Sequence, residues 1–133
     1  MPRSTIKGGS FTTPGVAKTA SYTLKVRDSG KIFTNRGATG TITFTLPKIV
    51  STSSSMNGIE YEFFTVAAQI ITVASDPVDK MVTTANVTAN AVSSIAAIGT
   101  HFRVVCDGTS WLVEANPGTV AGGLSVQDVT VTA

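Results

Sequence analysis

The sequence predicts an all-β fold, either an antiparallel β-sandwich of jelly-roll type or a small β-barrel. Three observations lead to this prediction. The chain contains 21 Thr and 16 Val among its 133 residues, and β-branched side chains favour strands over helices. Short segments alternate apolar and polar residues with a period of two, which is typical of strands with one buried face. Gly, Asp and Asn clusters separate these segments and supply the turns.

The clearest strand lies at residues 41–46, where Ile42, Phe44 and Leu46 alternate with three threonines. This alternation places three large apolar side chains on one face of the strand and three hydroxyl groups on the other. Residues 28–40, which precede it, contain a turn, a short strand and a glycine-bounded loop. The whole stretch predicts a β-sheet with one buried face.

Other segments also have strand character. An alternating strand is expected at residues 21–27, and a continuous apolar strand in the middle of a sheet at residues 69–74. Residues 59–66 begin with alternation, but Phe64 and Val66 fall on the opposite parity. This segment therefore predicts either a strand buried on both faces or a β-bulge.

A β-hairpin is predicted late in the domain. Residues 101–106 and 110–115 both have strand composition, and Asp107-Gly108 between them is a tight-turn signal. The segment before the hairpin gives weaker signals. Its residues 91–98 fit either a short helical turn or an irregular strand.

The chain divides into three parts, at residues 1–20, 21–120 and 121–133. The first part is small and polar with widely spaced apolar residues, which predicts an extended N-terminal arm that is either disordered or laid along another surface. The second part is the β-sandwich domain. The third part follows Gly122-Gly123 and predicts a C-terminal tail strand, which pairs either with its own domain or with the edge of a neighbouring subunit.

The net charge of +2 conceals a division along the chain. Residues 1–48 hold eight Lys and Arg residues and one Asp, a net charge of +7. Residues 49–133 hold two basic and seven acidic residues, a net charge of −5. The two parts can attract each other between copies, or the basic part can bind an acidic partner; ordinary solvated charge is the alternative. Only 14% of the residues are charged, so part of the surface is expected to be covered by a partner.

Residues with catalytic or metal-binding chemistry are sparse. His101 is the only histidine and Cys106 the only cysteine, so a nucleophile–histidine device and a zinc site both lack the necessary partners. We expect Cys106 to be a buried structural thiol and His101 to be a half-exposed strand residue. The sequence therefore predicts that the protein is not an enzyme and that it has no cofactor, metal or small-molecule substrate.

The remaining acidic residues fit surface roles. Asp76 and Asp79 share a loop but lack the alternating ligands of a calcium site, so we expect solvated turn carboxylates. Glu60 and Glu62 are expected on one exposed strand face, where they form a negative stripe and do not face each other across a cleft. The basic first third has few aromatic residues, which does not favour nucleic-acid binding. No apolar run is long enough to cross a membrane.

Two segments resemble a pattern that recurs in small bacteriophage virion proteins. The first occupies residues 28–47 and contains DSGKIFTN, GATG and ITFTLP. The second is the closing hairpin at residues 99–113, which contains VVCDGTSWLV. Similar hairpins occur in head decoration proteins, head fibres and tail-fibre modules, and the resemblance covers residues 21–119. It implies an all-β structural part of a phage particle, usually oligomeric, and it implies no catalytic residues.

The function expected from this resemblance is that of a capsid decoration (cement) protein. The protein would bind the outer surface of the head as a homodimer or homotrimer and stabilise it by bridging subunits of the major capsid protein. The alternative is a head-fibre, tail-fibre or receptor-binding module that contacts the host surface. In either case the protein would be made in the host cytoplasm and incorporated into the virion.

The residues expected to contact partners lie in the N-terminal arm and the C-terminal tail. In the arm, positive charge is combined with apolar anchors. In the tail, valines alternate with other residues. These expected contact residues are Arg3, Ile6, Lys7, Phe11, Val16, Val129 and Val131.

Overall fold

The computed structural model contains two main β-sheets and one small one, with no α-helix in the part of the chain that it describes. The prediction of an all-β fold is therefore confirmed. Side chains are described as far as Glu114, and only the backbone beyond it. The described residues are 14–50, 56–83, 88–115, 117–119, 125–127 and 129–132.

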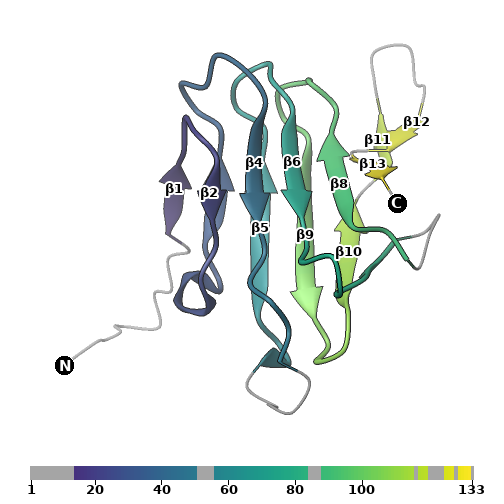
Figure 1. Ribbon diagram of the computed structural model, residues 1–133. Helices are drawn as coiled ribbons and strands as arrows, with labels where there is room; N and C mark the ends of the chain where they lie inside the picture. Colours follow the sequence, from purple (N-terminus) through teal and green to yellow (C-terminus); the bar gives the residue numbers. More distant parts are fainter. Residues whose placement is uncertain are drawn as a thin grey trace, which may run out of the picture.

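The two main sheets overlie each other in two layers (Figure 1). Sheet A has the strand order β1-β3-β5-β9-β10-β7, and sheet B the order β13-β8-β6-β4-β2. The strands of sheet A are β1 (Gly15–Ala17), β3 (Ile32–Thr34), β5 (Glu60–Phe64), β7 (Met81–Val82), β9 (His101–Cys106) and β10 (Trp111–Ala115). The strands of sheet B are β2 (Tyr22–Thr23), β4 (Ile42–Thr45), β6 (Ile71–Ala74), β8 (Ala91–Ser94) and β13 (Val129–Thr132).

Strands β1 to β6 alternate between the two sheets. When a strand in one sheet is followed by a strand in the other, the chain runs up the first sheet and down the second. The third strand then starts at the same end of the first sheet as the first strand did, so the two run parallel. Accordingly, β1, β3 and β5 pair in parallel, and so do β2, β4 and β6. The later strands β8, β9 and β13 pair antiparallel with their neighbours. The expectation of a wholly antiparallel sandwich is therefore wrong, because both sheets are mixed.

Alternation decides which side chains face the core. In β4 the apolar residues predicted to face inward are buried and Thr45 is exposed. In β5, Tyr61 and Phe63 are fully buried, whereas Phe64 is 38% exposed. The strand therefore keeps one buried face through its whole length. Neither the predicted bulge nor burial on both faces occurs.

The core between the sheets is built around aromatic rings. The ring centroid of Phe33 in sheet A lies 5.4 Å from that of Phe44 in sheet B, and Phe44 lies 5.2 Å from Phe63. Phe102 stacks on Phe63 with 5.1 Å between centroids. Rings at these separations attract each other in addition to burying apolar area. Because both sheets contribute rings to one cluster, the cluster holds them face to face.

A buried asparagine fixes the turns at one end of the sheets. Asn35 is fully buried, and its amide group donates to the carbonyl oxygens of Ala67 and Gln69, both at 3.1 Å. Its Oδ1 accepts the backbone amides of Val66 and Ala67 at 2.8 and 2.9 Å. The side chain thus uses both donors and accepts two hydrogen bonds. It ties the turn after β3 to the turn after β5.

The turn after β6 differs from expectation at one residue. Asp76 accepts the amide of Val78 at 3.0 Å, as expected of a turn carboxylate. Asp79, however, is buried, and its Oδ2 accepts the amide of Ile49 at 2.8 Å. Asp79 therefore links this turn to the segment after β4, and the prediction that it is a solvated carboxylate is wrong.

The predicted hairpin is confirmed, because β9 and β10 pair antiparallel with Trp111 opposite Cys106. Its turn is closed by the Oδ1 of Asp107, which accepts the amides of Thr109 and Ser110 at 2.9 and 2.7 Å. These hydrogen bonds, the one from Ser110 first, hold the pKa of Asp107 below its ordinary value. Gly108 has a φ of +92°, a left-handed conformation that favours glycine.

Two segments are more irregular than predicted. At residues 21–27 the strand is limited to β2, and a 3₁₀ turn follows at Val26–Asp28. At residues 91–98 the first four residues form strand β8, so the alternative of a short helical turn is wrong for that part. A small separate sheet pairs β11 (Pro117–Thr119) with β12 (Ser125–Gln127).

Parts of the arm and of the tail belong to the main sheets. Within residues 1–20, β1 is an edge strand of sheet A and pairs with β3. Within residues 121–133, β13 is an edge strand of sheet B and pairs antiparallel with β8. Of the two pairings considered for the tail, the structure shows the one with its own domain.

Candidate docking faces

The outer face of sheet B carries no charge on its strands, since no described strand of this sheet contains a charged residue. The alternation that buries Phe44, Val73 and Val92 directs hydroxyl and methyl groups outward. This surface is named the hydroxyl face. Its members are Thr23, Thr43, Thr45, Thr72, Ala74, Ala91 and Ser93.

Cross-strand register aligns the hydroxyl face in rows. Thr43 lies opposite Thr72, and Thr72 lies opposite Ser93. The Oγ1 of Thr72 and the Oγ of Ser93 are 2.9 Å apart and share a hydrogen bond. A second row begins with Thr23 opposite Thr45. It continues with Ala74 and Ala91. Because neighbouring strands lie about 4.8 Å apart, small uncharged groups, hydroxyl or methyl, repeat regularly across the sheet.

The hydroxyl face is suited to protein contact. A hydroxyl group can donate and accept hydrogen bonds, and covering it costs less than covering an ionised group. Four strands of four residues and one of two, at about 4.8 Å per strand and about 3.3 Å per residue, span about 300 Å². This area is well below the ~800 Å² per partner that a stable interface buries. A partner on this face therefore needs further contacts beside it.

The outer face of sheet A holds every charged residue found in the described strands. These residues lie on the adjacent strands β5, β9 and β10, where they line an open hollow of about 530 Å³. This hollow is named the charged groove. Its lining residues are Glu60, Glu62, His101, Phe102, Arg103 and Glu114.

Arg103 lies at the centre of the charged groove. Its Nε donates to the Oε1 of Glu60 at 3.0 Å, and its Nη1 donates to the Oε1 of Glu114 at 2.9 Å. Register also places Glu62 opposite Arg103, yet Glu62 has no ion-pair partner among the described residues. One guanidinium group faces three carboxylates, so the groove keeps a net negative charge. Because the paired side chains are partly exposed, each pair contributes about 0–1 kcal/mol.

An apolar depression adjoins the charged groove. It has a volume of about 320 Å³, and its apolar walls are Val105, Leu112 and Val113. Leu112 is 39% exposed. Next to the groove, the ring of Phe64 stacks on that of His101, with 5.3 Å between centroids and 8° between planes. The outer face of sheet A thus combines charge with exposed apolar surface.

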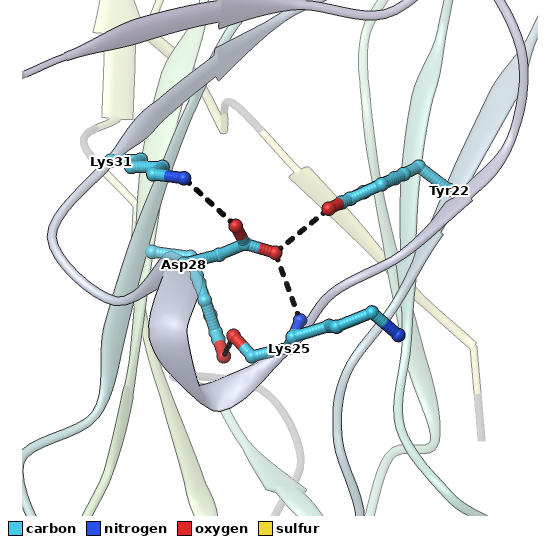
Figure 2. A network of polar contacts seen from close by, with 5 residues as sticks. Tyr22, Lys25, Asp28 and Lys31 are labelled. Carbon is cyan, nitrogen blue, oxygen red and sulfur yellow. Dashed lines mark hydrogen bonds and ion pairs between the residues drawn. The ribbon is translucent and has the colours of Figure 1, made fainter.

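Asp28 is the centre of a polar network beside sheet A (Figure 2). This carboxylate is buried, and its Oδ2 accepts the hydroxyl of Tyr22 and the amide of Lys25, both at 3.0 Å. Its Oδ1 accepts the Nζ of Lys31, also at 3.0 Å. Three donors from three residues therefore fix the turn that leads into β3.

The same turn positions the first residue of β5. The Oγ of Ser29 accepts the amide of Glu60 at 3.1 Å, and the amide of Gly30 donates to the carbonyl of Glu60 at 2.8 Å. The hydroxyl of Tyr61 donates to the carbonyl of Lys25 at 2.7 Å. These bonds hold Glu60 at the edge of the charged groove, so the role of the network is structural.

The network keeps its carboxylate ionised. Burial alone raises the pKa of Asp28, but hydrogen bonds from Lys31, the amide of Lys25 and Tyr22 outweigh it and hold this pKa below its ordinary value. The hydrogen bond to Asp28 in turn raises the pKa of the Tyr22 phenol. The Nζ of Lys18 lies 3.8 Å from the centroid of the Tyr22 ring, a cation–π contact. Asp28 therefore acts as a fixed negative charge and not as a proton donor.

The contact residues predicted from the sequence are not brought together in one place. Val16 lies on β1 at the edge of sheet A, half-buried and packed against the core. Val129 and Val131 lie on β13 at the edge of sheet B, opposite Ser94 and Val92. The predicted residues outside the described part of the chain are Arg3, Ile6, Lys7 and Phe11.

Two features bear on metal binding and thiol chemistry in the described part of the chain. There, no group of three His, Cys, Asp or Glu side chains could hold a metal ion. Cys106 is buried, as predicted, and burial raises the pKa of its thiol, which makes it a weak nucleophile at neutral pH. None of the described helical segments has the length and apolar character needed to cross a membrane.

Sequence reasoning located part of both faces. It identified the hydroxyl groups of residues 41–46 and the stripe of Glu60 and Glu62, but it missed Arg103 and Glu114 as their neighbours. Counting outward from the predicted hairpin turn would have placed these two residues opposite each other, as they are in the structure. The pairing of β5 with β9 has no such local signal, because it joins strands far apart in the chain.

Comparison with known proteins does not supply a family for the chain. Neither a scan against models of protein families nor a search of curated proteins finds a match.

Proposed function

We propose that this chain is a structural protein of a bacteriophage virion, a decoration (cement) protein bound to the outer surface of the head. In this proposal the hydroxyl face lies against the major capsid protein. The observation that carries it is the separation of charge in the described strands, none on sheet B and all on sheet A. The resemblance of residues 28–47 and 99–113 to phage virion proteins supports the choice of partner.

The separation of charge favours sheet B as the covered side. An ionised side chain that loses water without gaining a partner costs several kcal/mol, whereas hydroxyl groups can exchange water for hydrogen bonds across an interface. Charged residues are accordingly depleted at the centres of protein interfaces. A partner can cover the hydroxyl face without burying a charge. Sheet A presents charges that are better kept in water.

The size of the hydroxyl face requires additional contacts. Its area of about 300 Å² falls short of the ~800 Å² per partner typical of stable complexes. The arm, the tail or a second copy of the chain must supply the remainder. A homodimer or homotrimer that spans neighbouring capsid subunits would multiply this small contact by avidity, and it would stabilise the shell by binding only the assembled state.

Of the finer topologies expected from the sequence, we propose the sandwich. Each main sheet ends in two different edge strands, β1 and β7 in sheet A and β13 and β2 in sheet B, which argues for open sheets over a closed barrel. The parallel pairs among β1 to β6 are foreign to a wholly antiparallel jelly roll.

The second candidate is a fibre or receptor-binding module. The charged groove, at about 530 Å³, is of a size that takes small ligands or a short segment of a partner. Its negative charge and the adjoining apolar depression would then contact the host surface. In that case the outer face of sheet A, and not that of sheet B, would contact the partner. No catalytic role is proposed for either candidate.

Copy number and partner distinguish the two candidates. The protein should be present at hundreds of copies per particle by quantitative gel, as expected for the capsid surface of a virion. The purified chain should also co-sediment with undecorated heads but not with host cells. A few copies at a vertex or tail, together with binding to host cells, would contradict the decoration role and support the fibre role. Deletion of residues 1–13, which leaves strand β1 in place, should weaken head binding, and undiminished binding would show that these residues do not contact the head.

A further inference from the structure

The charged groove and the segment that precedes β1 carry opposite charge. The groove contains three carboxylates and one guanidinium group. Residues 1–13 contain Arg3 and Lys7 as their only charged side chains. The groove therefore has an excess of negative charge where this segment has only positive charge, and the two attract each other.

The segment leaves β1 level with the groove. Gly15 lies opposite Ile32, Ile32 opposite Glu62, and Glu62 opposite Arg103. The carbonyl of Pro14 accepts the amide of Ile32 at 2.9 Å, which fixes the point of departure. With about 4.8 Å between strands, β5 lies about 10 Å and β9 about 15 Å from β1. Thirteen extended residues reach about 43 Å, so their length is ample.

The segment and the outer face of sheet A also match in chemistry. Arg3 and Lys7 suit the polar hollow, where carboxylates exceed cations. Ile6, nine residues before the start of β1, suits the apolar depression, where Leu112 is 39% exposed to water. A segment that alternates basic and apolar residues thus meets a surface that places acidic and apolar walls side by side.

We propose that residues 1–13 bind along the charged groove of their own chain. A tethered segment meets its site at an effective concentration of about millimolar, so contacts too weak to join separate chains at micromolar concentration are sufficient within one chain. Binding is sensitive to salt, because exposed charge pairs are screened. This inference concerns the isolated protein and does not depend on the proposed function.

The test uses paramagnetic relaxation in the full-length protein. A nitroxide is attached at Thr5→Cys, which keeps both cations of the segment. Cys106 is buried and its thiol has a raised pKa, so labelling of the native protein is directed to the new cysteine. The unsubstituted chain, which should take up no label, is the control for this step. We expect the amides of Glu62, Arg103 and Glu114 to broaden more strongly than those of Thr43 and Thr72, because sheet B lies about 10 Å further from the label.

Two perturbations should remove the broadening. In about 1 M NaCl, where the Debye length is about 3 Å, the amides of the groove should sharpen. The isosteric pair Glu62→Gln and Glu114→Gln should have the same effect at low salt. The matched control, Arg36→Gln, changes an exposed charge outside both the segment and the groove and should leave the broadening unchanged. Chemical shifts of core amides verify that every variant is folded.

Mixing experiments complete the test. Isotope-labelled chain without nitroxide is mixed with unlabelled chain that carries it, so that any broadening must come from another molecule. We expect none at micromolar concentration. Broadening in the mixture equal to that in the single-chain sample would show that the groove takes a segment of a second copy and would overturn the proposal. Equal broadening on both faces, or broadening that survives the glutamine pair, would also overturn it.

Discussion

The two outer faces of this molecule enclose the same core but differ in chemistry. The strands of sheet B present threonine, serine and alanine in register, with no charge. The strands of sheet A present three carboxylates, one arginine and an exposed apolar depression. Strands β3 to β6 belong alternately to the two sheets, so successive strands along the chain contribute to opposite faces. The faces are therefore not contiguous blocks of sequence.

Charge divides differently along the sequence and in the folded molecule. Along the sequence, charge divides into a basic first third and an acidic remainder. In space, the division that matters is between the sheets. The basic residues of the first third that the structure describes all lie outside strands; they are Lys18, Lys25, Arg27, Lys31, Arg36 and Lys48. The basic first third of the sequence thus contributes no charge to the strands of either face, and every charged residue in the strands of sheet A comes from the acidic remainder.

The largest effect on stability is expected in β5, where neighbouring phenylalanines lie on the core side and on the outer side of the strand. Phe63 is fully buried whereas its neighbour Phe64 is 38% exposed on the side of sheet A. Phe63→Ala should lower the free energy of unfolding by about 4 kcal/mol because it leaves a cavity among aromatic rings. Phe64→Ala should lower it by about 1 kcal/mol. Urea unfolding measures both, and equal losses would show that β5 has no distinct outer face.

A charge placed on the hydroxyl face should weaken binding to the head. Thr72→Lys puts an ammonium group at the centre of sheet B, where the proposed partner would have to cover it. Head binding measured by co-sedimentation should weaken about 100-fold, the equivalent of about 3 kcal/mol. The control is Glu114→Lys on sheet A, for which less than a threefold change is expected. Similar losses from both variants would leave no basis for assigning the contact to sheet B.

The polar network around Asp28 should have an intermediate effect on stability. Asp28→Asn removes the negative charge that three donors share, and it should cost about 2 kcal/mol at pH 7. Because hydrogen bonding holds the folded-state pKa of Asp28 below its ordinary value, this contribution is present above the unfolded pKa of about 3.9. It is lost as pH falls through the folded-state pKa.

The corresponding measurement is urea unfolding of both proteins between pH 7 and pH 2. The stability gap between the unsubstituted chain and Asp28→Asn should stay constant down to about pH 4 and close below it. A gap that persists to pH 2 would mean that the substitution acts through packing and not through the charge of Asp28.

The smallest effect is expected at the centre of the charged groove. Arg103→Gln removes the ion pairs to Glu60 and Glu114, whose side chains are 43% and 69% exposed. The free energy of unfolding should fall by about 0.5 kcal/mol at low salt and by less at high salt. Thermal unfolding at two ionic strengths measures this difference. A loss above 2 kcal/mol would indicate that the groove is a structural network and not a surface feature.

Much of the fold could be predicted from local patterns. Alternation identified the buried side of β4, and the Asp107-Gly108 turn identified the hairpin, because neighbouring residues determine both features. The parallel pairing of β1 to β6 could not be predicted in this way. The pairing depends on whether each turn stays in one sheet or crosses to the other. The turn after β3, for example, is fixed by Asn35, whose side chain accepts the amides of Val66 and Ala67, about thirty residues away in the chain.

The candidate faces could be predicted only in part, because their full extent also depends on contacts between distant segments. The threonines of β4 are visible in the sequence, but their continuation across β6 and β8 requires the register of Thr43, Thr72 and Ser93. The burial of Asp79 likewise depends on Ile49, thirty residues earlier. Contacts of this kind are set by tertiary packing, so a single sequence without its fold does not reveal them.

The orientation of the protein on a particle tests the central claim most directly. A cryo-EM map of a decorated head, at a resolution that separates the strands, shows which sheet faces the shell. We predict that the hydroxyl face, with Thr43, Thr72 and Ser93, lies against the capsid and that the charged groove faces outward. A map with the groove against the capsid and the hydroxyl face in solvent would contradict the assignment of the two faces.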